Sequence, residues 1–275
     1  MTPDASVSER LRASLTLAQR LRGAYAQGTV LGTFVIELPT PRAIRALALA
    51  GFDFVVLDLE HSPIDVASLP PLVSEAHACG LPVLVRPWGH DAGMIGKLLD
   101  LGANGVLIPH VGSAAEAQAV AAAARYAPLG VRGVCPLIAT TAFSDPVAEL
   151  GRAPLVLVQI EGRAGLENAA EIAAVAGIDG VFVGPHDLSH ALGAPGEVEG
   201  AAVADAAAAI AQDAGADLML GVYVDHPRDS LRWALRGYRL QCIDFDGRML
   251  LESARATLDV ARNGRVGTSH DRSPA

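Results

Sequence analysis

The feature that most constrains the fold is a regular alternation of short apolar segments with longer helical ones. Eight segments rich in Val, Ile and Leu have the length and composition of buried strands, and each precedes a stretch with a helical pattern. The strand candidates are 31–36, 53–57, 82–86, 105–109, 154–160, 179–183, 218–223 and 239–243. The helical candidates are 40–50, 65–79, 91–101, 113–126, 164–176, 200–214, 227–236 and 247–262.

This alternation predicts parallel βαβ units. Eight such units close into a barrel of about 250 residues, which accounts for most of the 275 residues. An open doubly wound sheet usually has fewer units, and the first strand lacks the Gly-x-Gly-x-x-Gly fingerprint of a dinucleotide site. We therefore predict an α/β fold with one (β/α)8 TIM barrel over 1–262. It includes an extra N-terminal helix at about 7–26, and a disordered tail follows at 263–275.

Glycines punctuate this repeat. Gly51, Gly102 and Gly177 each stand between a predicted helix and the next strand. A helix commonly ends on a residue in the left-handed conformation, which glycine adopts without steric cost. We therefore interpret these three glycines as helix ends rather than as a phosphate-binding loop.

Charge and cysteine content exclude several classes of protein. The formal net charge is −9, so the basic surface of a nucleic-acid-binding protein is not expected. No apolar run approaches the roughly 20 residues that cross a bilayer, and no signal peptide is apparent. Cys79, Cys135 and Cys242 are odd in number and widely spaced, which argues against a disulfide framework. We expect a cytoplasmic protein that binds neither nucleic acid nor membrane.

Polar residues end or directly follow four of the predicted strands at their carboxyl ends, where barrels of this kind have their active sites. They are Asp58, Glu60, His61, Arg86, Gln159, Glu161 and the segment Gly184-Pro185-His186-Asp187. An isolated buried charge is very costly, so these groups must be paired or reach solvent. Four such sets at one end of a barrel are expected to converge on one pocket.

Each residue taken singly also has a structural interpretation. Glu161 or Asp187 would serve equally well as a helix cap. His61 fits an ordinary loop, Arg86 would simply neutralise Asp58 or Glu60, and Asp100 fits a helix surface. The coincidence of four sets at one barrel end favours the functional interpretation.

The residue types indicate a metal-assisted reaction of a 2-oxo acid. Glu161 and Asp187, without Cys or His partners, suit a hard cation such as Mg²⁺ or Mn²⁺, which acts as a Lewis acid on a keto oxygen. Arg86 would add positive charge where an enolate oxygen develops, and His61 would move a proton. The chain's single lysine, Lys97, lies within a predicted helix, which disfavours an imine mechanism.

Several motifs together resemble the HpcH/HpaI aldolase family, in that family's order, over about residues 28–260. They are FDFVVLDLEH at 52–61, VRP at 85–87, LDLGA at 99–103, RYAPLGVRG at 125–133, VQIE at 158–161 and VGPHDLS at 183–189. The resemblance implies a metal-dependent, class II pyruvate aldolase on a (β/α)8 barrel. It also implies a hexamer in which neighbouring subunits exchange the last helix.

The resemblance also implies a role for each matching residue. Those that would bind Mg²⁺, Mn²⁺ or Co²⁺ are Glu161 and Asp187. Gln159 would contact the 2-oxo acid, and the backbone of Gly184 and Pro185 would hold its carboxylate. Arg86, braced by Asp58, would lie on the enolate, while His61, supported by Asp100, would be the acid and base.

We therefore expect reversible cleavage of 4-hydroxy-2-oxo acids to pyruvate and an aldehyde through a metal-stabilised enolate. The alternatives are a citrate-synthase-like or acyl-CoA-lyase-like enzyme of the same superfamily, or a non-catalytic binding barrel.

The residues alone leave two alternatives for the packing of the last predicted helix. The apolar face of 247–262 would pack on the chain's own strands or on a neighbour. The resemblance implies the second case, a homo-oligomer and specifically a hexamer.

Overall fold

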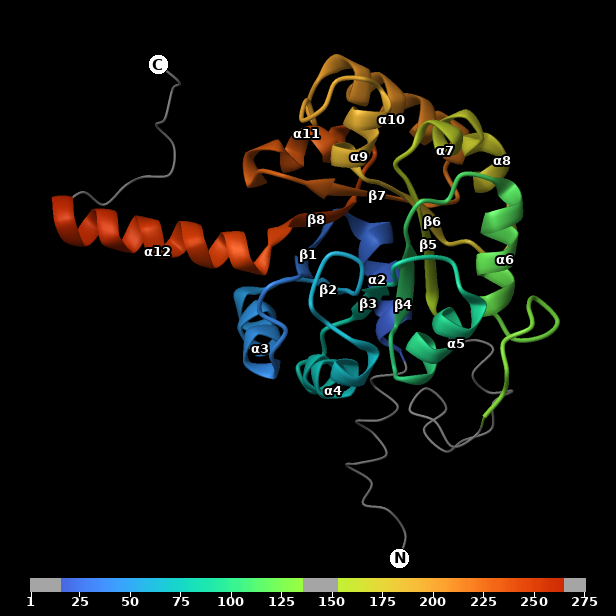
Figure 1. Ribbon diagram of the computed structural model, residues 1–275, viewed down its shortest axis with the longest axis horizontal. Coiled ribbons are helices and arrows are strands. Elements are labelled where there is room, and N and C mark those ends of the chain that lie inside the picture. The colour runs from blue at the N-terminus through green and yellow to red at the C-terminus, as the bar shows by residue number, and fades with distance from the viewer. Residues whose placement is uncertain (1–15, 136–152, 265–275) are drawn as a thin grey trace, which may run out of the picture.

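The computed structural model, which describes residues 16–135 and 153–264, confirms the closed eight-stranded barrel (Figure 1). All strands are parallel and pair in chain order, and the last pairs with the first. They are β1 (Val30–Val35), β2 (Phe54–Asp58), β3 (Val83–Arg86), β4 (Gly105–Ile108), β5 (Leu155–Ile160), β6 (Gly180–Val183), β7 (Met219–Val224) and β8 (Leu240–Phe245). Each predicted strand lies within two residues of these bounds.

Helices that follow the strands surround the barrel, apart from α2, which precedes β1, and α12, which projects from the barrel (Figure 1). They are α2 (Leu17–Gln27), α3 (Pro41–Ala50), α4 (Leu69–Ala78), α5 (Ala92–Asp100), α6 (Ala114–Ala124), α7 (Arg163–Glu167), α8 (Ala169–Ala173), α9 (Pro185–Ala191), α10 (Ala201–Ala214), α11 (Ser230–Leu235) and α12 (Asp246–Asn263), with 3-10 turns η1 (Val66–Ser68) and η3 (Pro227–Asp229). The helix predicted at 164–176 is two short helices that meet at Asn168. Gly51, Gly102 and Gly177 have φ of 97°, 103° and 96°, as predicted for helix ends. No helix among the described residues is both long enough and apolar enough to traverse a bilayer.

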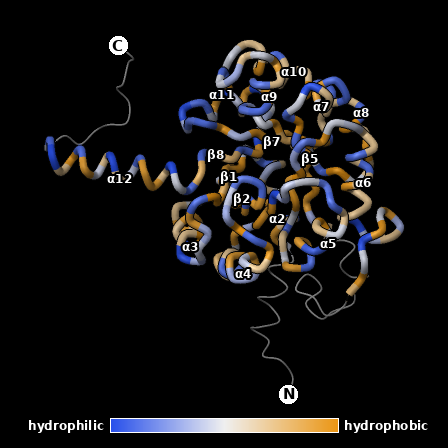
Figure 2. Tube along the Cα trace, in the orientation of Figure 1, coloured by the Kyte–Doolittle hydropathy of each residue, from blue (hydrophilic) through white to orange (hydrophobic). Residues whose placement is uncertain are grey.

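The core has two layers, separated by the strands themselves. Successive strand residues point to opposite faces, so Phe54 and Val56 fill the barrel interior while Val55 and Leu57 face the helices. In Figure 2 the hydrophobic colour is concentrated in the central strands and on the inner sides of the helices around them. This packing closes the interior to solvent, so the functional surface lies at a barrel end.

Helix α2 covers the amino-terminal end of the barrel. Its Leu17, Leu21 and Tyr25 are buried, and the Tyr25 hydroxyl accepts a hydrogen bond of 2.8 Å from the Leu220 amide at the start of β7. The extra N-terminal helix is thus present from Leu17, whereas residues 7–15 of the predicted range, like most of the predicted tail, lie outside the described residues. The carboxyl end of the barrel is left open for a site.

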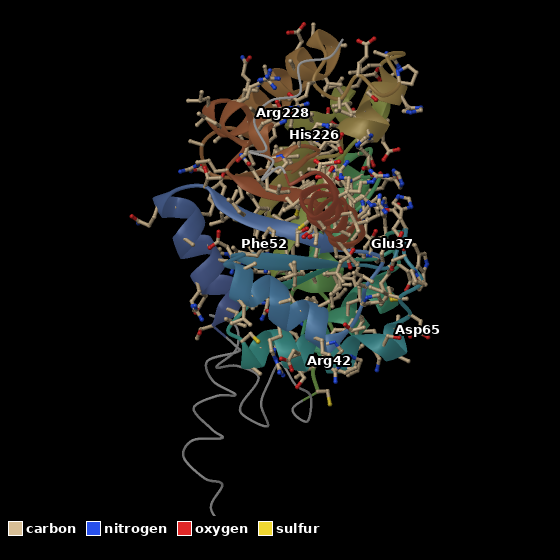
Figure 3. All side chains as sticks on the ribbon, turned by 90° about the vertical axis from the view of Figure 1, so that its left-hand side faces the viewer. Glu37, Arg42, Phe52, Asp65, His226 and Arg228 are labelled. Atoms are coloured by element: carbon tan, nitrogen blue, oxygen red, sulfur yellow. The ribbon has the colours of Figure 1, made fainter. Side chains whose placement is uncertain are left out.

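Helix α12 projects away from the barrel instead of lying against it (Figure 1), and in Figure 3 it points toward the viewer. Every residue from 250 to 264 is exposed. At its base, Asp246 is buried and accepts hydrogen bonds from the amides of Ile36, Glu37 and Leu38 at 3.1, 3.0 and 2.8 Å. The alternative in which this helix packs on the chain's own strands 8 and 1 is therefore wrong.

Candidate active site

An open pocket of about 360 Å³ lies at the carboxyl end of the barrel. Its lining includes seven of the residues singled out in the sequence: His61, Arg86, Gln159, Gly184, Pro185, His186 and Asp187. These side chains and backbone groups come from β2, β3, β5, β6 and the turns that follow them. The predicted convergence of separate strand ends on one pocket therefore occurs.

Arg86, at the end of β3, is held by the Asp58 carboxylate at the end of the neighbouring strand. Its Nε and Nη2 donate hydrogen bonds of 2.8 and 2.7 Å to the two oxygens of Asp58, and Glu60 lies 3.3 Å from Nε. The guanidinium also lies over the Phe34 ring, 4.6 Å from its centre. Burial opposes the charge, but Asp58, Glu60 and Glu161 outweigh it and raise the pKa of Arg86. Arg86 is thus a fixed cation at the pocket wall.

Glu161 is a carboxylate almost removed from solvent, with 2% of its residue surface exposed. Its Oε1 accepts a hydrogen bond of 2.8 Å from the backbone amide of His110. The Nδ1 atom of His110 also lies 2.8 Å from this oxygen. Its Oε2 accepts a short hydrogen bond from the Gln159 amide. Burial, with the charges of Asp187 and Glu60, raises the pKa of Glu161 to about 7, although His110 acts in the opposite direction. Protonated and ionised forms of Glu161 are therefore both accessible near neutral pH.

Gly184 leaves the space that Glu161 needs. A β-carbon at position 184 would lie 2.5 Å from Oε2 of Glu161 and 2.8 Å from Nε2 of Gln159. Gly184 is also the N-cap of α9, and Asp187 is exposed in the first turn of that helix without capping it. Because Gly162 is the N-cap of α7, neither carboxylate acts as the helix cap that a structural interpretation requires.

His61 and Asp100 lie in different surroundings. The His61 side chain is 59% exposed, lines the pocket and has Nε2 3.7 Å from Oε2 of Glu60. Asp100, the last residue of α5, accepts a hydrogen bond of 2.7 Å from Nη2 of Arg132. Within the described part of the chain no contact joins Asp100 to His61, so the predicted support of His61 by Asp100 stays a prediction.

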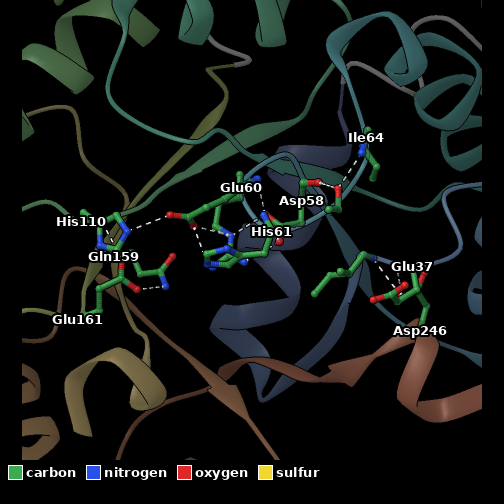
Figure 4. Close-up of polar contacts among 12 residues, drawn as sticks. Glu37, Asp58, Glu60, His61, Ile64, His110, Gln159, Glu161 and Asp246 are labelled. Atoms are coloured by element: carbon green, nitrogen blue, oxygen red, sulfur yellow. Dashed lines mark hydrogen bonds and ion pairs between the residues drawn. The ribbon is translucent and has the colours of Figure 1, made fainter. Parts of the chain in front are cut away.

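The structure also places His110 in the site, which our sequence reasoning missed. Its Nε2 atom lies 2.9 Å from Oε1 of Glu60, so the ring bridges Glu60 and Glu161 (Figure 4). The available signal was its position directly after the strand predicted at 105–109. The rule applied to the other strand ends identifies this residue as well.

An aromatic wall is a second feature that the strand-end rule did not identify. Three of the chain's six Phe residues line the pocket, as does Tyr223 of β7. The Phe34 ring makes edge contacts with Phe182 and Tyr223, at centroid distances of 6.5 and 5.9 Å. Arg248 of α12 donates hydrogen bonds to the Tyr223 hydroxyl and to Asp225, at 3.1 and 2.8 Å. One side of the pocket is therefore apolar, and its rim is tied to the base of α12.

The oxygen atoms at this site fit a hard divalent cation only if other ligands complete its coordination shell. No cluster of three or more His, Cys, Asp or Glu side chains arranged for a metal exists within residues 16–135 and 153–264. Asp187 and Gln159 line the pocket, and the Glu161 carboxylate lies beside it, hydrogen-bonded to Nε2 of Gln159. The buried Oε1 of Gln159 has no hydrogen-bond partner among the described residues. All are oxygen donors, as Mg²⁺ prefers, and Mg²⁺ sites commonly use one or two carboxylates with water and substrate.

Comparison with known proteins shows the family. Residues 32–252 match the family described as HpcH/HpaI aldolase/citrate lyase. The chain belongs to this family. A hydroxypyruvate/pyruvate aldolase of Pseudomonas aeruginosa is 46% identical over 64% of this chain and 65% of its own length. A 5-keto-4-deoxy-D-glucarate aldolase of Shigella sonnei is 41% identical over 57% and 62%. The matched part of the chain thus spans slightly less than two thirds of these relatives.

Solved structures match over nearly their whole length. The HpcH/HpaI aldolase from Desulfitobacterium hafniense is 30% identical, with a TM-score of 0.82 over 88% of this chain and 96% of its own. The citrate synthase SbnG is 27% identical, with a TM-score of 0.79 over 91% and 98%. The barrel therefore carries both aldolase and citrate synthase activities among its relatives.

Proposed function

We propose that this chain is a divalent-metal-dependent class II aldolase, a carbon–carbon lyase. It would cleave 4-hydroxy-2-oxo acids reversibly to pyruvate and an aldehyde. The observation that carries the proposal is that the braced guanidinium of Arg86 lines the pocket together with Gln159 and Gly184. These two residues lie against Oε2 of the buried Glu161 carboxylate. The aldolase names of relatives at 46% and 41% identity support the same reaction.

Residues at the floor of the pocket would bind the 2-oxo acid and its cation. Glu161 and Asp187 would hold Mg²⁺, Mn²⁺ or Co²⁺, and that ion, when bound, supplies Lewis-acid polarisation of a keto oxygen. Gln159, Gly184 and Pro185 line the pocket, and the substrate carboxylate would lie against the backbone of the last two. The unpartnered Oε1 of Gln159 supports a role in binding, because buried polar atoms are rarely left without a partner.

Arg86 would stabilise the negative charge that forms during cleavage. Asp58 engages Nε and Nη2, so Nη1 is the guanidinium nitrogen without a hydrogen bond to the described residues. When the carbon–carbon bond breaks, its electron pair passes to the pyruvate fragment as an enolate. A cation already fixed by Asp58 stabilises that charge without reorganising, which is the main source of electrostatic catalysis.

His61 would move the proton of the 4-hydroxyl group. In the cleavage direction it accepts this proton as the aldehyde forms, and the enolate then takes up a proton to become pyruvate. The exposed ring at the pocket fits this role because it can exchange protons with solvent. We retain Asp100 as a proposed support for His61, although its ion pair within the chain is with Arg132.

A citrate-synthase-like reaction is the second candidate, and the similarity to SbnG favours it. The same enolate chemistry with another electrophile would use the same pocket residues Gln159, Gly184 and Pro185. An acyl-CoA-lyase-like reaction and a non-catalytic binding barrel are the further alternatives. A binding protein has no evident use for a buried, raised-pKa carboxylate beside a buried cation.

We also propose that the chain forms a homo-oligomer, specifically a hexamer, by exchange of α12. The projecting helix exposes Leu250, Leu251 and Leu258 by 57%, 48% and 49%. An apolar face without a partner in its own chain is typical of an interface.

The proposed location is the cytoplasm, which the free thiols of Cys79, Cys135 and Cys242 support.

One assay tests the function. Pyruvate release is measured from a panel of 4-hydroxy-2-oxo acids with Mg²⁺, Mn²⁺ or Co²⁺. In a second arm, citrate formation and release of free CoA are measured from oxaloacetate plus acetyl-CoA. We expect activity in the first arm, which chelation and Glu161→Gln abolish. Activity in the second arm alone would establish the citrate-synthase-like alternative, and activity in neither would favour a binding barrel. Full activity after exhaustive chelation would refute the metal-dependent mechanism.

A further inference from the structure

His110 has an unusual backbone conformation at the edge of the site. It follows Pro109 at the end of β4 and has a φ of 55°. Asp244 is the other non-glycine residue with positive φ within the described ranges. Such strained conformations persist where the surroundings enforce them, and they cluster at functional sites. The conformation of His110 therefore calls for a specific set of contacts.

The left-handed turn directs two nitrogen atoms of His110 at one oxygen of Glu161. The backbone nitrogen and Nδ1 both lie 2.8 Å from Oε1. The other oxygen, Oε2, faces Gln159 and Gly184, which line the pocket. His110 thus engages one oxygen of Glu161 and leaves the opposite oxygen on the pocket side.

The same ring links Glu161, through Glu60, to the guanidinium of Arg86. Its Nε2 lies 2.9 Å from Oε1 of Glu60, and Oε2 of Glu60 lies 3.3 Å from Nε of Arg86. Figure 4 shows Glu60 between His110 on one side and Asp58 and His61 on the other. The path is anchored further by His90, whose Nε2 lies 2.6 Å from the Pro109 carbonyl oxygen next to His110.

We propose that His110 is a positioning residue for the metal site, acting through Glu161 rather than on substrate. It orients the Glu161 carboxylate for a divalent cation and couples that orientation, through Glu60, to Arg86. The inference rests on the proposed function, because it requires Glu161 to be a metal ligand. Partners that orient a ligand commonly change metal affinity by about 10- to 100-fold when they are removed.

The test measures Mn²⁺ affinity of the full chain without substrate, by electron paramagnetic resonance of free Mn²⁺ and pulsed detection of bound Mn²⁺. We expect His110→Ala to weaken Mn²⁺ binding by about 10- to 100-fold. His110→Asn should recover part of the loss, because asparagine tolerates the left-handed conformation and supplies a side-chain donor. Mn²⁺ bound to the unaltered protein should show no coupling to an imidazole nitrogen.

His226→Ala is the matched control. His226 is half-exposed, and its Nε2 lies 3.9 Å from Oδ2 of Asp225. It makes no ion pair with Glu60 or Glu161 within the described residues, so its removal should leave Mn²⁺ affinity unchanged. Thermal unfolding of each metal-free variant separates a loss of folding from a loss of the site.

Three results would overturn the proposal. Unchanged affinity in His110→Ala, while the unaltered protein binds Mn²⁺, would remove the positioning role and leave the proposed function standing. Nitrogen coupling lost in His110→Ala would make His110 a ligand instead. Failure of the unaltered protein to bind Mn²⁺ would refute both the inference and the metal-dependent function.

Discussion

Asp58 and Arg86 form a two-point hydrogen-bonded pair across neighbouring strands, with N–O distances of 2.8 and 2.7 Å and with Asp58 fully buried. Removal of one partner of such a pair leaves a buried charge without compensation. Because Arg86 also lines the pocket, the same pair contributes to the stability of the barrel and fixes a positive charge at the pocket.

The first prediction concerns stability. Asp58→Ala should lower the free energy of unfolding by about 3 kcal/mol, the lower end of the range for broken buried ion pairs, since Glu60 still lies near Arg86. Urea denaturation measures the change. Asp187→Ala removes an exposed carboxylate of the same pocket and should stay within about 0.5 kcal/mol of the unaltered protein. Equal losses in the two variants would contradict the argument.

The second prediction separates the roles of Arg86 and His61. Arg86→Ala should lose aldol cleavage, oxaloacetate decarboxylation and proton exchange at the pyruvate methyl group, because all three pass through the same enolate. His61→Ala should lose cleavage by about 10²- to 10⁴-fold and decarboxylation far less, because decarboxylation removes no hydroxyl proton. Parallel kinetics of the three reactions measure this. The division of roles fails if both variants lose all three reactions equally.

The third prediction uses the glycine beside the metal-binding carboxylate. Gly184→Ala should weaken Mn²⁺ binding at least about tenfold, because its β-carbon would displace Oε2 of Glu161. Gly162→Ala is the control, since a β-carbon there meets nothing within 4 Å although it adjoins Glu161. Equilibrium dialysis with Mn²⁺ compares the two variants. Normal binding in Gly184→Ala would show that Oε2 does not need this space.

The fourth prediction is a pH dependence of metal binding. Burial raises the pKa of Glu161 to about 7, so below that pH the metal-free carboxyl group carries a proton that must leave when a cation binds. Mn²⁺ affinity should therefore rise by up to about tenfold per pH unit below neutrality and level off above about pH 7.5. Calorimetry in buffers of different ionisation enthalpy should detect close to one proton released at acidic pH. An affinity independent of pH between about 5.5 and 8 would refute the assignment.

The fifth prediction concerns assembly. Deletion of residues 247–275, or Leu251→Asp with Leu258→Asp, should convert the proposed hexamer into smaller species. Burying an unpaired charge in an apolar interface has a large free-energy cost. Light scattering at micromolar concentration measures the mass. Leu231→Asp, on α11 and 70% exposed, is the control and should leave assembly intact. A monomeric unaltered protein would exclude the oligomer.

The barrel and much of the pocket were predictable from the sequence, for a physical reason. Parallel strands buried on both faces are continuous apolar runs, and Gly51, Gly102 and Gly177 mark the helix ends between them. Because all strands run the same way around a closed barrel, their carboxyl ends share one rim. Residues such as Arg86 and Gln159 therefore meet at one pocket although they are far apart in the chain.

Other features depended on tertiary structure. Periodicity describes an apolar face but not its partner, so α12 looks the same in sequence whether it packs on its own strands or projects, as it does here. Asp100 pairs with Arg132 because their helix and loop pack together, which no local pattern indicates. His110 combines a left-handed backbone with contacts to Glu60 and Glu161 from two other segments, and those contacts exist only once the barrel has closed.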